Sequence, residues 1–431
     1  MNDKGLAMDA LAHAAVFAEG PERDAARARI REEAAQAEVH TASIQPLYDA
    51  MGRGEVGGFT TPAINVRGMA YDMSRAVMRS ALRNDVGAVI FELARSEMGY
   101  SHQSADEYAT VVHAAAVREG FSGPLFIQGD HYQVNAKKYA AGGATRETEI
   151  RAIKDLIAAA IAAGYRNIDI DASTIVDLSK GSVPEQQRDN VMVSADLAAH
   201  VRALEPAGTT ISIGGEIGEV GGVNSTPEEM RAYMDGMLEE LARRGGTPMR
   251  GPSKISIQTG TTHGGIPLPD GTIAKVSIDF GVLEEISRIG RAEYGMAGAV
   301  QHGASTLPLD AFDRFPKAGA AEVHLATDFQ NIILDHSSFP ATLRSSMYAW
   351  CDRECASERS AGQTDEQFHY KTRKKTWGPF KRQVWELPEA IRQELRAALE
   401  AKFDILFAKL GVVGSVRVVR DRVQPSPVTR D

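Results

Sequence analysis

Short apolar runs alternate with longer amphipathic stretches along most of the chain. Between the short runs, stretches such as 147–165 and 226–245 carry apolar residues at helical spacing. The short runs are rich in β-branched residues and predict strands beginning near Thr60, Val86, Pro124, Asn167, Thr210, Lys254, Ala297 and Ala321. Strands that are apolar on both faces are typical of a parallel sheet covered by helices. Repeated strand–helix units of this number predict an α/β fold, a closed (β/α)₈ TIM barrel.

Two regions lie outside the predicted barrel. Residues 1–40 are rich in Ala, Arg and Glu, and predict a helical N-terminal extension packed outside the barrel or against another subunit. Residues 341–431 predict a C-terminal helical extension that ends in a polar tail. The chain is therefore divided into an extension, a barrel domain over 41–340 and a second extension.

Composition narrows the class of protein. The chain has 431 residues, 43% hydrophobic and 24% charged, with a net charge of −9, which argues against general nucleic-acid or anionic-membrane binding. No apolar run approaches the roughly 20 residues of a membrane span, and we expect no secretory function of residues 1–38, which contain no apolar h-region. Cys351 and Cys355 are the only cysteines, so no disulfide framework is expected and a cytoplasmic location is predicted. We interpret both cysteines as structural.

Four predicted strand ends carry side chains that could bind a metal ion. His131, His263 and His302 each stand where a strand runs into a glycine-rich loop, and Glu216 ends another strand. A single histidine is more often a surface or core residue than a ligand. Because the carboxyl ends of parallel barrel strands meet at one rim, repetition at the same offset predicts that these side chains converge. Three imidazoles and a carboxylate suit a divalent metal with an open position.

Two further signals surround the predicted metal site. Asp130 directly precedes His131, and a turn at the strand end could bring both to the rim, where Asp130 would act as a general acid/base. The alternative is that Asp130 caps the following helix. Glycines after His263 and His302 could leave backbone N–H groups accessible to a phosphate, and Thr327 could add a hydroxyl. The alternative is that these glycines only form turns.

These residues together resemble the class II, metal-dependent fructose-bisphosphate aldolases and the related tagatose-bisphosphate aldolases. The resemblance covers roughly residues 41–340 and rests on the order and spacing of several motifs. The motifs are Asn65 on the first strand, Gly129-Asp130-His131, Glu216-Ile217-Gly218 followed by Gly221-Gly222, His263-Gly264, and His302-Gly303-Ala304-Ser305.

The resemblance implies a zinc-dependent aldolase, with another divalent metal as an option and a monovalent cation as a further cofactor. It implies that His131, His263 and His302 are the metal ligands, with Glu216 as an alternative ligand. Asp130 would handle the C4 hydroxyl proton of the cleaved bond. The residues expected to face the substrate or its phosphate are Asn65, Gly264, Gly303, Ser305, His324 and Thr327.

The implied reaction belongs to carbohydrate metabolism of the glycolytic kind. A phosphorylated ketose, similar to fructose 1,6-bisphosphate, would be cleaved to dihydroxyacetone phosphate and an aldehyde through a metal-stabilised enediolate. The implied partners are the sugar phosphate and further copies of the chain, as a homo-oligomeric dimer or tetramer. No nucleic-acid or membrane partner is expected.

The chain departs from the family pattern at two places, which keeps other functions open. Asn224 stands where the family carries an acidic residue, and His324 stands where the family offers an asparagine. One alternative is a non-catalytic accessory barrel subunit of a sugar-bisphosphate aldolase. Another is a metal-dependent sugar isomerase or hydrolase. The basic run that begins at Arg373 is interpreted as a solvated face or as a second anchor for an anionic substrate.

Overall fold

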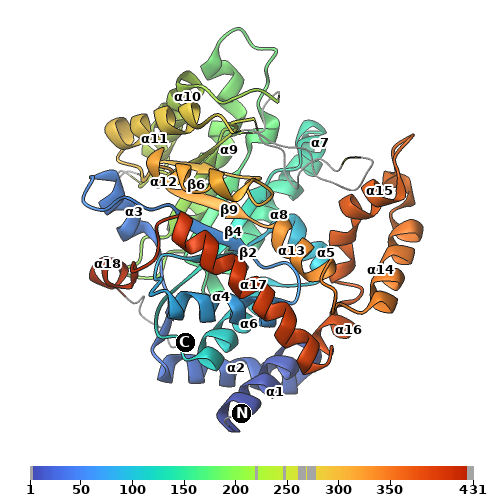
Figure 1. The fold of residues 1–431 in the computed structure, drawn as a ribbon. Helices are drawn as coiled ribbons and strands as arrows, with labels where there is room; N and C mark the ends of the chain where they lie inside the picture. Colours follow the sequence, from blue (N-terminus) through green and yellow to red (C-terminus); the bar gives the residue numbers. More distant parts are fainter. Residues whose placement is uncertain (1–2, 219–221, 246–248, 261–267, 269–277, 425–431) are drawn as a thin grey trace.

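Eight parallel strands close into a barrel (Figure 1). The computed structural model describes residues 3–218, 222–245, 249–260, 268 and 278–424. Each barrel strand pairs with the next along the chain, and the last pairs with the first. The strands are β2 (Thr61–Asn65), β3 (Ile90–Ala94), β4 (Gly123–Gln133), β5 (Asn167–Asp171), β6 (Ser212–Glu216), β7 (Lys254–Ile257), β8 (Ala299–Gln301) and β9 (Glu322–Leu325). All the predicted strands and the TIM barrel are confirmed.

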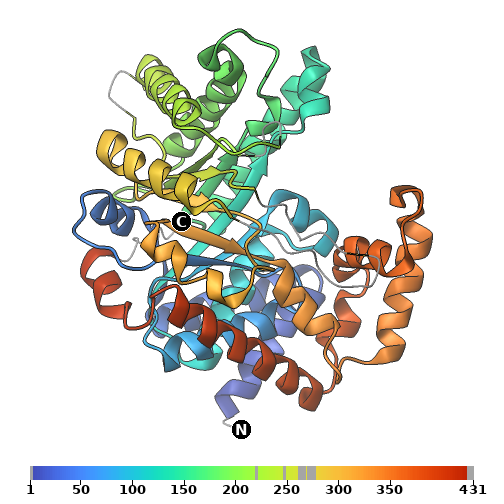
Figure 2. The same ribbon diagram turned by 45° about the horizontal axis from the view of Figure 1, so that its top comes forward.

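Helices cover the outside of the barrel (Figure 2). Those between β2 and β6 are α4 (Ala70–Arg83), α5 (Arg95–Ser101), α6 (Ala105–Glu119), α7 (Ala136–Ala140), α8 (Gly143–Ala162) and α9 (Val183–Ala203). Those after β6 are α10 (Pro227–Gly245), α11 (Phe280–Tyr294), α12 (Arg314–Lys317) and α13 (Thr327–Leu334), while α3 (Gln45–Gly52) precedes β2. A reciprocal cap begins α10, because the Thr226 hydroxyl accepts from the Glu229 amide and the Glu229 side chain accepts from the Thr226 amide.

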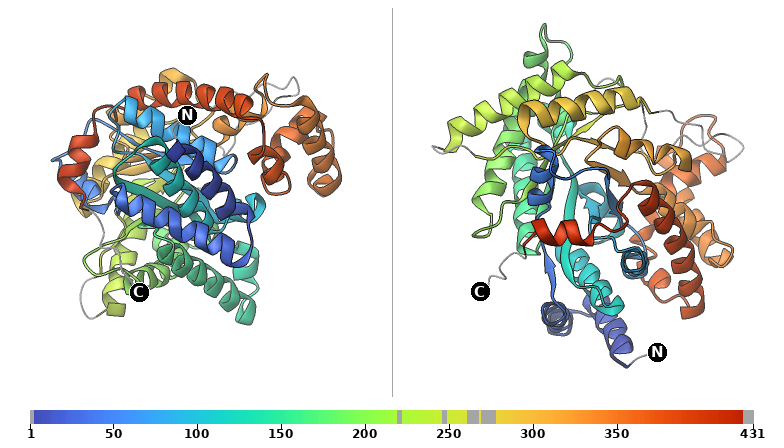
Figure 3. Two further views of the ribbon diagram at one scale, coloured as in Figure 1. Left: turned by 90° about the horizontal axis from the view of Figure 1, so that it is seen from below. Right: turned by 60° about the vertical axis from the view of Figure 1, so that its left-hand side comes forward.

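The N-terminal residues form two helices and a strand that the sequence did not predict. α1 (Asp3–Phe17) and α2 (Gly20–Gln36) lie side by side and pack against α6 of the same chain (Figure 3). β1 (Val39–Thr41) then pairs in parallel with the amino end of β4, beginning at Val39 opposite Gly123. This pairing is possible because β4 is the longest strand and extends beyond its barrel neighbours. The expected helical extension is therefore confirmed, and an additional strand joins it to the sheet.

The C-terminal residues form a mostly helical region with two parts. We call residues 341–385 the helical excursion: α14 (Ala341–Glu354), α15 (Asp365–Thr372), the 3₁₀ segment η4 (Arg373–Trp377) and α16 (Lys381–Trp385). The excursion stands to one side of the barrel, and α17 (Glu389–Lys409) then returns across it to pack on α4 (Figure 1). A short helix, α18 (Val416–Arg422), follows. Among the described helices none is long and apolar enough to span a bilayer.

Both cysteines serve a structural purpose in the excursion. Cys351 and Cys355 are free thiols, buried with Phe368 in a small apolar cluster of their own. Burial raises the pKa of the Cys351 thiol to about 11, so it stays protonated and unreactive at neutral pH. The structural interpretation from the sequence agrees with this environment.

An irregularity in β4 shapes the rim of the barrel. Gly129 lies opposite Ile168 of β5, yet Tyr132 lies opposite Ile170, so β4 contains one more residue than its partner over this step. Such a bulge interrupts the alternation of side chains. A β-carbon on Gly129 would lie 2.4 Å from the Tyr132 ring, which explains the glycine. The bulge contains Asp130 and His131, and His131 has a positive φ of 40°.

Candidate metal centre and its cavity

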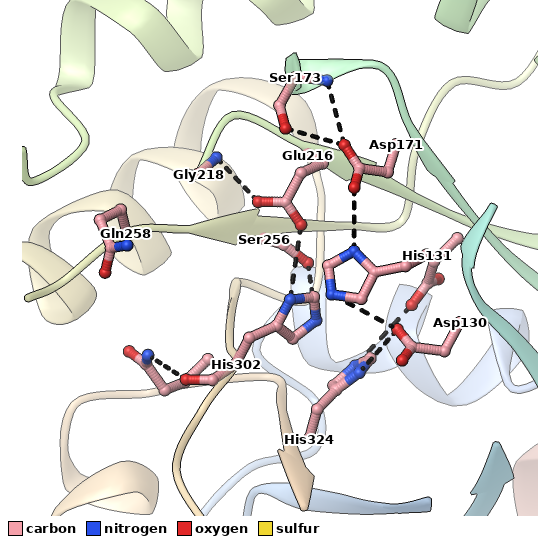
Figure 4. Close-up of polar contacts among 12 residues, drawn as sticks. Asp130, His131, Asp171, Ser173, Glu216, Gly218, Ser256, Gln258, His302 and His324 are labelled. Atoms are coloured by element: carbon pink, nitrogen blue, oxygen red, sulfur yellow. Dashed lines mark hydrogen bonds and ion pairs between the residues drawn. The ribbon is translucent and has the colours of Figure 1, made fainter. Parts of the chain in front are cut away.

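Three of the predicted metal ligands converge at the rim (Figure 4). His131 comes from the β4 bulge, Glu216 ends β6 and His302 directly follows β8. One ligand atom from each lies within 4.8 Å of the others. The His302 Nδ1 atom is 3.6 Å from a Glu216 oxygen, and the rings of His131 and His302 have centroids 4.2 Å apart. Two imidazole nitrogens and a carboxylate oxygen at this spacing fit zinc or a similar divalent ion.

A carboxylate behind the centre fixes one of these ligands. Asp171, the last residue of β5, lies 3.0 Å from Nδ1 of His131. It also accepts hydrogen bonds from the Ser173 hydroxyl and the Gln133 amide, at 2.8 and 2.6 Å. A histidine held through one nitrogen presents the other to a metal, and such carboxylate partners orient many metal ligands. Sequence reasoning missed Asp171, although it ends a strand at the same offset as the predicted ligands.

The electrostatics of the centre favour a cation. Burial opposes the charged form of His131, but the carboxylates of Asp130 and Asp171 outweigh it and raise the pKa of His131 well above its usual value. Glu216 adds a further negative charge and also accepts a hydrogen bond from the Gly218 amide at 2.8 Å. Carboxylates gathered around buried imidazoles create the negative potential that a divalent ion would neutralise.

Asp130 lies beside the centre and faces a fourth histidine. The β4 bulge lets both Asp130 and His131 reach the rim, and the two side chains approach to 3.9 Å. Nδ1 of His324, on β9, is 3.2 Å from an Asp130 oxygen, and the His324 and His302 rings have centroids 4.1 Å apart. The helix that follows β4 is capped by Asn135, whose side chain accepts from the Lys138 amide. Asp130 therefore does not serve as that cap.

Charged side chains continue below the rim into the barrel. Lys254, at the start of β7, lies 2.5 Å from a Glu322 oxygen and 3.0 Å from Asp169. The same Glu322 oxygen is 2.6 Å from Nε2 of His324, and Glu92 is 3.0 Å from its Nδ1. Burial would raise the pKa of Glu322, but the Lys254 charge lowers it to about 2. This buried network holds His324 from below, and the sequence did not predict it.

Glu92 and Glu322 differ in pKa, because Lys254 pairs with Glu322. Burial and the Asp130 charge raise the pKa of Glu92 to about 8, so the protonated acid predominates at neutral pH. Two buried glutamates on neighbouring sides of His324 therefore differ in charge. The imidazole has an anionic partner below it and a largely neutral one beside it.

A cavity of about 1010 Å³ opens beside the candidate centre. The strand ends form one wall and residues of the helical excursion form another. Predicted site residues that line the cavity are Asn65, Asp130, His131, His302, Gly303, Ser305, His324 and Thr327. The Ser305 hydroxyl is 3.4 Å from the Asp328 amide, in the first turn of α13. The structure thus brings Gly303, Ser305 and Thr327, three of the residues predicted to bind the phosphate, to the same cavity as His131 and His302.

Two of the predicted site residues, His263 and Gly264, lie outside the described residues, so the structure does not place them. Two others are described but do not line the cavity. Asn224, where the family pattern has an acid, is partly exposed and donates to Asp279 at 3.3 Å. Glu216 contacts His302 but does not line the cavity.

Comparisons with known proteins identify one matching family. The family model described as fructose-bisphosphate aldolase class-II matches residues 46–406. No protein of curated function matches the chain.

Several solved structures share the fold at low sequence identity. A fructose-bisphosphate aldolase from Campylobacter jejuni is 18% identical, with a TM-score of 0.52, over 87% of this chain and 96% of its own. A probable tagatose 6 phosphate kinase from Sinorhizobium meliloti is 17% identical, with a TM-score of 0.57, over 84% and 98%. The fructuronate-tagaturonate epimerase UxaE from Cohnella laeviribosi is 11% identical, with a TM-score of 0.57, over 83% and 82%.

Proposed function

The chain belongs to the class II fructose-bisphosphate aldolase family, and from this premise we propose that it is a zinc-dependent aldolase acting on a phosphorylated ketose. The products would be dihydroxyacetone phosphate and an aldehyde. The observation that carries the proposal is the convergence of His131, Glu216 and His302 beside Asp130, at the edge of the cavity. We further expect a cytoplasmic homo-oligomer.

The candidate ligands divide the work of holding the metal. His131 and His302 would supply nitrogen donors, His263 would supply a third, and Glu216 would act as the alternative ligand. When bound, a divalent ion supplies Lewis-acid polarisation of the ketone and stabilises the negative charge that develops on it. Asp171 keeps the His131 ring in its orientation throughout.

Asp130 would perform the proton transfer that accompanies bond cleavage. Its carboxylate takes the proton from the C4 hydroxyl, the carbon–carbon bond between C3 and C4 breaks, and C4 leaves as the aldehyde. The bonding electron pair remains on the carbon next to the ketone, which then gains a proton to give dihydroxyacetone phosphate. The position of Asp130, 3.2 Å from His324 and next to His131 in the chain, supports this role.

The phosphate of the ketose would bind where α13 begins. Gly303 and Ser305 after β8 and Thr327 at the first position of α13 all line the cavity. Backbone N–H groups at a helix amino end favour an anion. We assign Gly264 to the same cradle, and Asn65 and His324 to contacts with the sugar.

Metal analysis and an activity screen test the proposal together. We expect the purified protein to contain or bind about one zinc per chain, and to cleave one or more ketose phosphates in a screen with zinc, cobalt or manganese. Chelation should abolish cleavage, and borohydride should trap no Schiff base. Phosphoglycolohydroxamate, which mimics the enediolate, should inhibit. Activity that survives chelation, or covalent trapping with borohydride, would reject the assignment.

The Asp130–His324 pair favours a second candidate function, sugar isomerisation or epimerisation. A carboxylate and an imidazole 3.2 Å apart provide two proton-transfer groups on one side of the cavity. In that case the sugar would be converted to an isomer with the same number of carbon atoms, and no fragment would be released. Product analysis by NMR decides between the two functions, because only an aldolase releases a triose phosphate. A non-catalytic accessory role predicts no turnover of either kind.

A further inference from the structure

His324 is held in the same manner as the candidate metal ligand His131. Asp171 lies 3.0 Å from Nδ1 of His131, and Glu322 lies 2.6 Å from Nε2 of His324. The other nitrogen of each ring faces the same Asp130 oxygen, at 3.9 Å for His131 and 3.2 Å for His324 (Figure 4). A histidine held by a carboxylate through one nitrogen presents the other nitrogen to a metal. The rim therefore has a second imidazole in the position of a metal ligand.

Two carboxylates, which we call the rim acids, stand next to this nitrogen. Nδ1 of His324 is 3.2 Å from Asp130 and 3.0 Å from Oε2 of Glu92, a fully buried residue that reaches the cavity. Donors about 3.0–3.5 Å apart can share one ion through bonds of about 2.0–2.2 Å. The other Glu92 oxygen, Oε1, is buried and has no hydrogen-bond partner among the described residues. Asp130 and His324 also form, with His302, a group whose ligand atoms lie within 4.8 Å of one another.

The two cations near the rim acids are paired with other carboxylates. Lys254 lies 2.5 Å from Glu322 and 3.0 Å from Asp169. Arg67 lies 3.0 Å from Glu97. Burial would lower the pKa of Arg67, but Glu97 and the rim acids raise it, so Arg67 offsets part of the charge of the rim acids. Because each cation has another carboxylate as its close partner, the rim acids remain available to a metal ion.

We propose that Asp130, Glu92 and His324 form a second, weaker site for a divalent ion, and that an ion bound there inhibits cleavage. The inhibition rests on the proposed function, in which Asp130 is the base. A carboxylate that coordinates an ion has its lone pair engaged and cannot take the C4 hydroxyl proton. The ion must replace the proton that Glu92 carries at neutral pH, which makes this site weaker than the first. The site depends on His324, because an asparagine there would offer no imidazole nitrogen.

The second site is tested first by metal binding, which requires no turnover. The protein is loaded with one equivalent of zinc, and Mn²⁺ is titrated in while electron paramagnetic resonance measures the free ion. Zinc stays in the first site because such sites bind it more tightly than manganese. The test variants are His324→Asn and Glu92→Gln. Glu149→Gln is the matched control, because Glu149 is also a buried glutamate that lines the cavity, but its partners are Arg95 and Lys138.

We expect zinc-loaded wild type and Glu149→Gln to bind one Mn²⁺ per chain with the same affinity. His324→Asn and Glu92→Gln should each weaken this binding about tenfold or more, as for loss of a charged contact. Circular dichroism and the melting temperature confirm that each variant folds.

Cleavage of the ketose phosphate found in the activity screen is then measured over the same range of Mn²⁺. Filling the second site should lower the wild-type rate about tenfold or more, because a positioned base contributes about 10²–10⁴-fold. For each variant, the rate is compared with its own rate in zinc alone. The concentration of Mn²⁺ that halves it should shift with the dissociation constant of that variant.

Three results would overturn the inference: no binding of Mn²⁺ by zinc-loaded wild type, equal binding by wild type and both test variants, or undiminished cleavage with the second site filled. Failure of the proposed function gives a different result. If Mn²⁺ binding depended on His324 and Glu92 but no ketose phosphate were cleaved, the proposed function would be rejected and the second site would stand.

Discussion

The two walls of the cavity are built on different principles. On the strand-end wall each imidazole already has a partner within the chain: Asp171 holds His131, and Glu322 holds His324. On the helical wall Lys374 has no such partner among the described residues. A site that must act on a reacting bond benefits from groups fixed in advance. A site that must select a ligand can leave a charge for the ligand to neutralise.

The walls also differ in what positions them. Register between barrel strands sets the strand-end wall, whereas individual ion pairs such as Arg373–Asp335 attach the helical wall to α13. Substitutions on the first wall should therefore change metal binding or rate. Substitutions on the second should change affinity and selectivity. The following predictions test this division.

The largest effect is expected for His302→Ala. The substitution removes one nitrogen donor and the contact with Glu216 at 3.6 Å. Cleavage and proton exchange on dihydroxyacetone phosphate should both fall to background, a loss of more than about 10⁴-fold, because Lewis-acid stabilisation is worth several kcal/mol. Metal content and both rates are measured on the same preparation. If the variant kept its metal content and its cleavage rate, His302 would not be a ligand of the metal centre.

Asp130→Asn should separate the metal centre from bond cleavage. The amide keeps the shape of the side chain but cannot act as a base, so cleavage should fall about 10²–10⁴-fold while zinc and fold are retained. Proton exchange on dihydroxyacetone phosphate should suffer much less. Stopped assays of cleavage and deuterium exchange by NMR measure the two separately. Cleavage near the wild-type rate would exclude the acid/base role.

Asp171→Asn should weaken the metal site without touching substrate. Loss of the charged partner of His131 should lower metal affinity about 10- to 100-fold, as for other partners of metal ligands. Excess zinc should then restore most of the activity. Asp177→Asn is a suitable control, since Asp177 is exposed and its side chain contacts Ser179 and Lys180 of its own turn, away from the cavity lining. Activity lost beyond metal rescue would mean that Asp171 does more than orient His131.

The smallest effect is expected for Arg373→Gln. This change removes the ion pair between Arg373 of η4 and Asp335, the residue that directly follows α13. The Asp335 side chain is half exposed. Pairs with an exposed partner contribute at most about 1 kcal/mol to stability. We therefore expect KM for a ketose bisphosphate to rise no more than about fivefold, with kcat unchanged. Steady-state kinetics measure both constants. A fall in kcat would show that the helical wall also contributes to the chemistry.

The sequence predicted the strand-end wall better than the helical wall for a physical reason. Barrel strands carry a strong apolar pattern, and residues at equivalent offsets must meet at one rim, so the sequence alone groups His131, Glu216 and His302. The helical wall depends on how η4 docks, which no local pattern specifies. The sequence suggests the basic run from Arg373 as a possible anchor for an anionic substrate. It does not indicate that Lys374, rather than Lys375, lines the cavity.

Features that depend on pairing between distant residues were also missed. Lys254 and Glu322 stand at the starts of their strands, where a charged side chain usually faces solvent. Their burial becomes understandable only when each supplies the other's counter-charge. The bulge in β4 and the pairing of β1 likewise arise from register between strands, which the alternation of residues along one strand does not contain.

The positive φ of His131 has a consequence for how this barrel can evolve. A histidine in the left-handed region costs of order 1–3 kcal/mol, which glycine would not incur and asparagine would incur less. Selection for metal binding would maintain that burden, and position 131 would be among the first to change once such selection ended. A descendant barrel with glycine or asparagine there, and the rest of its rim intact, would mark a lineage that kept the scaffold and abandoned the reaction.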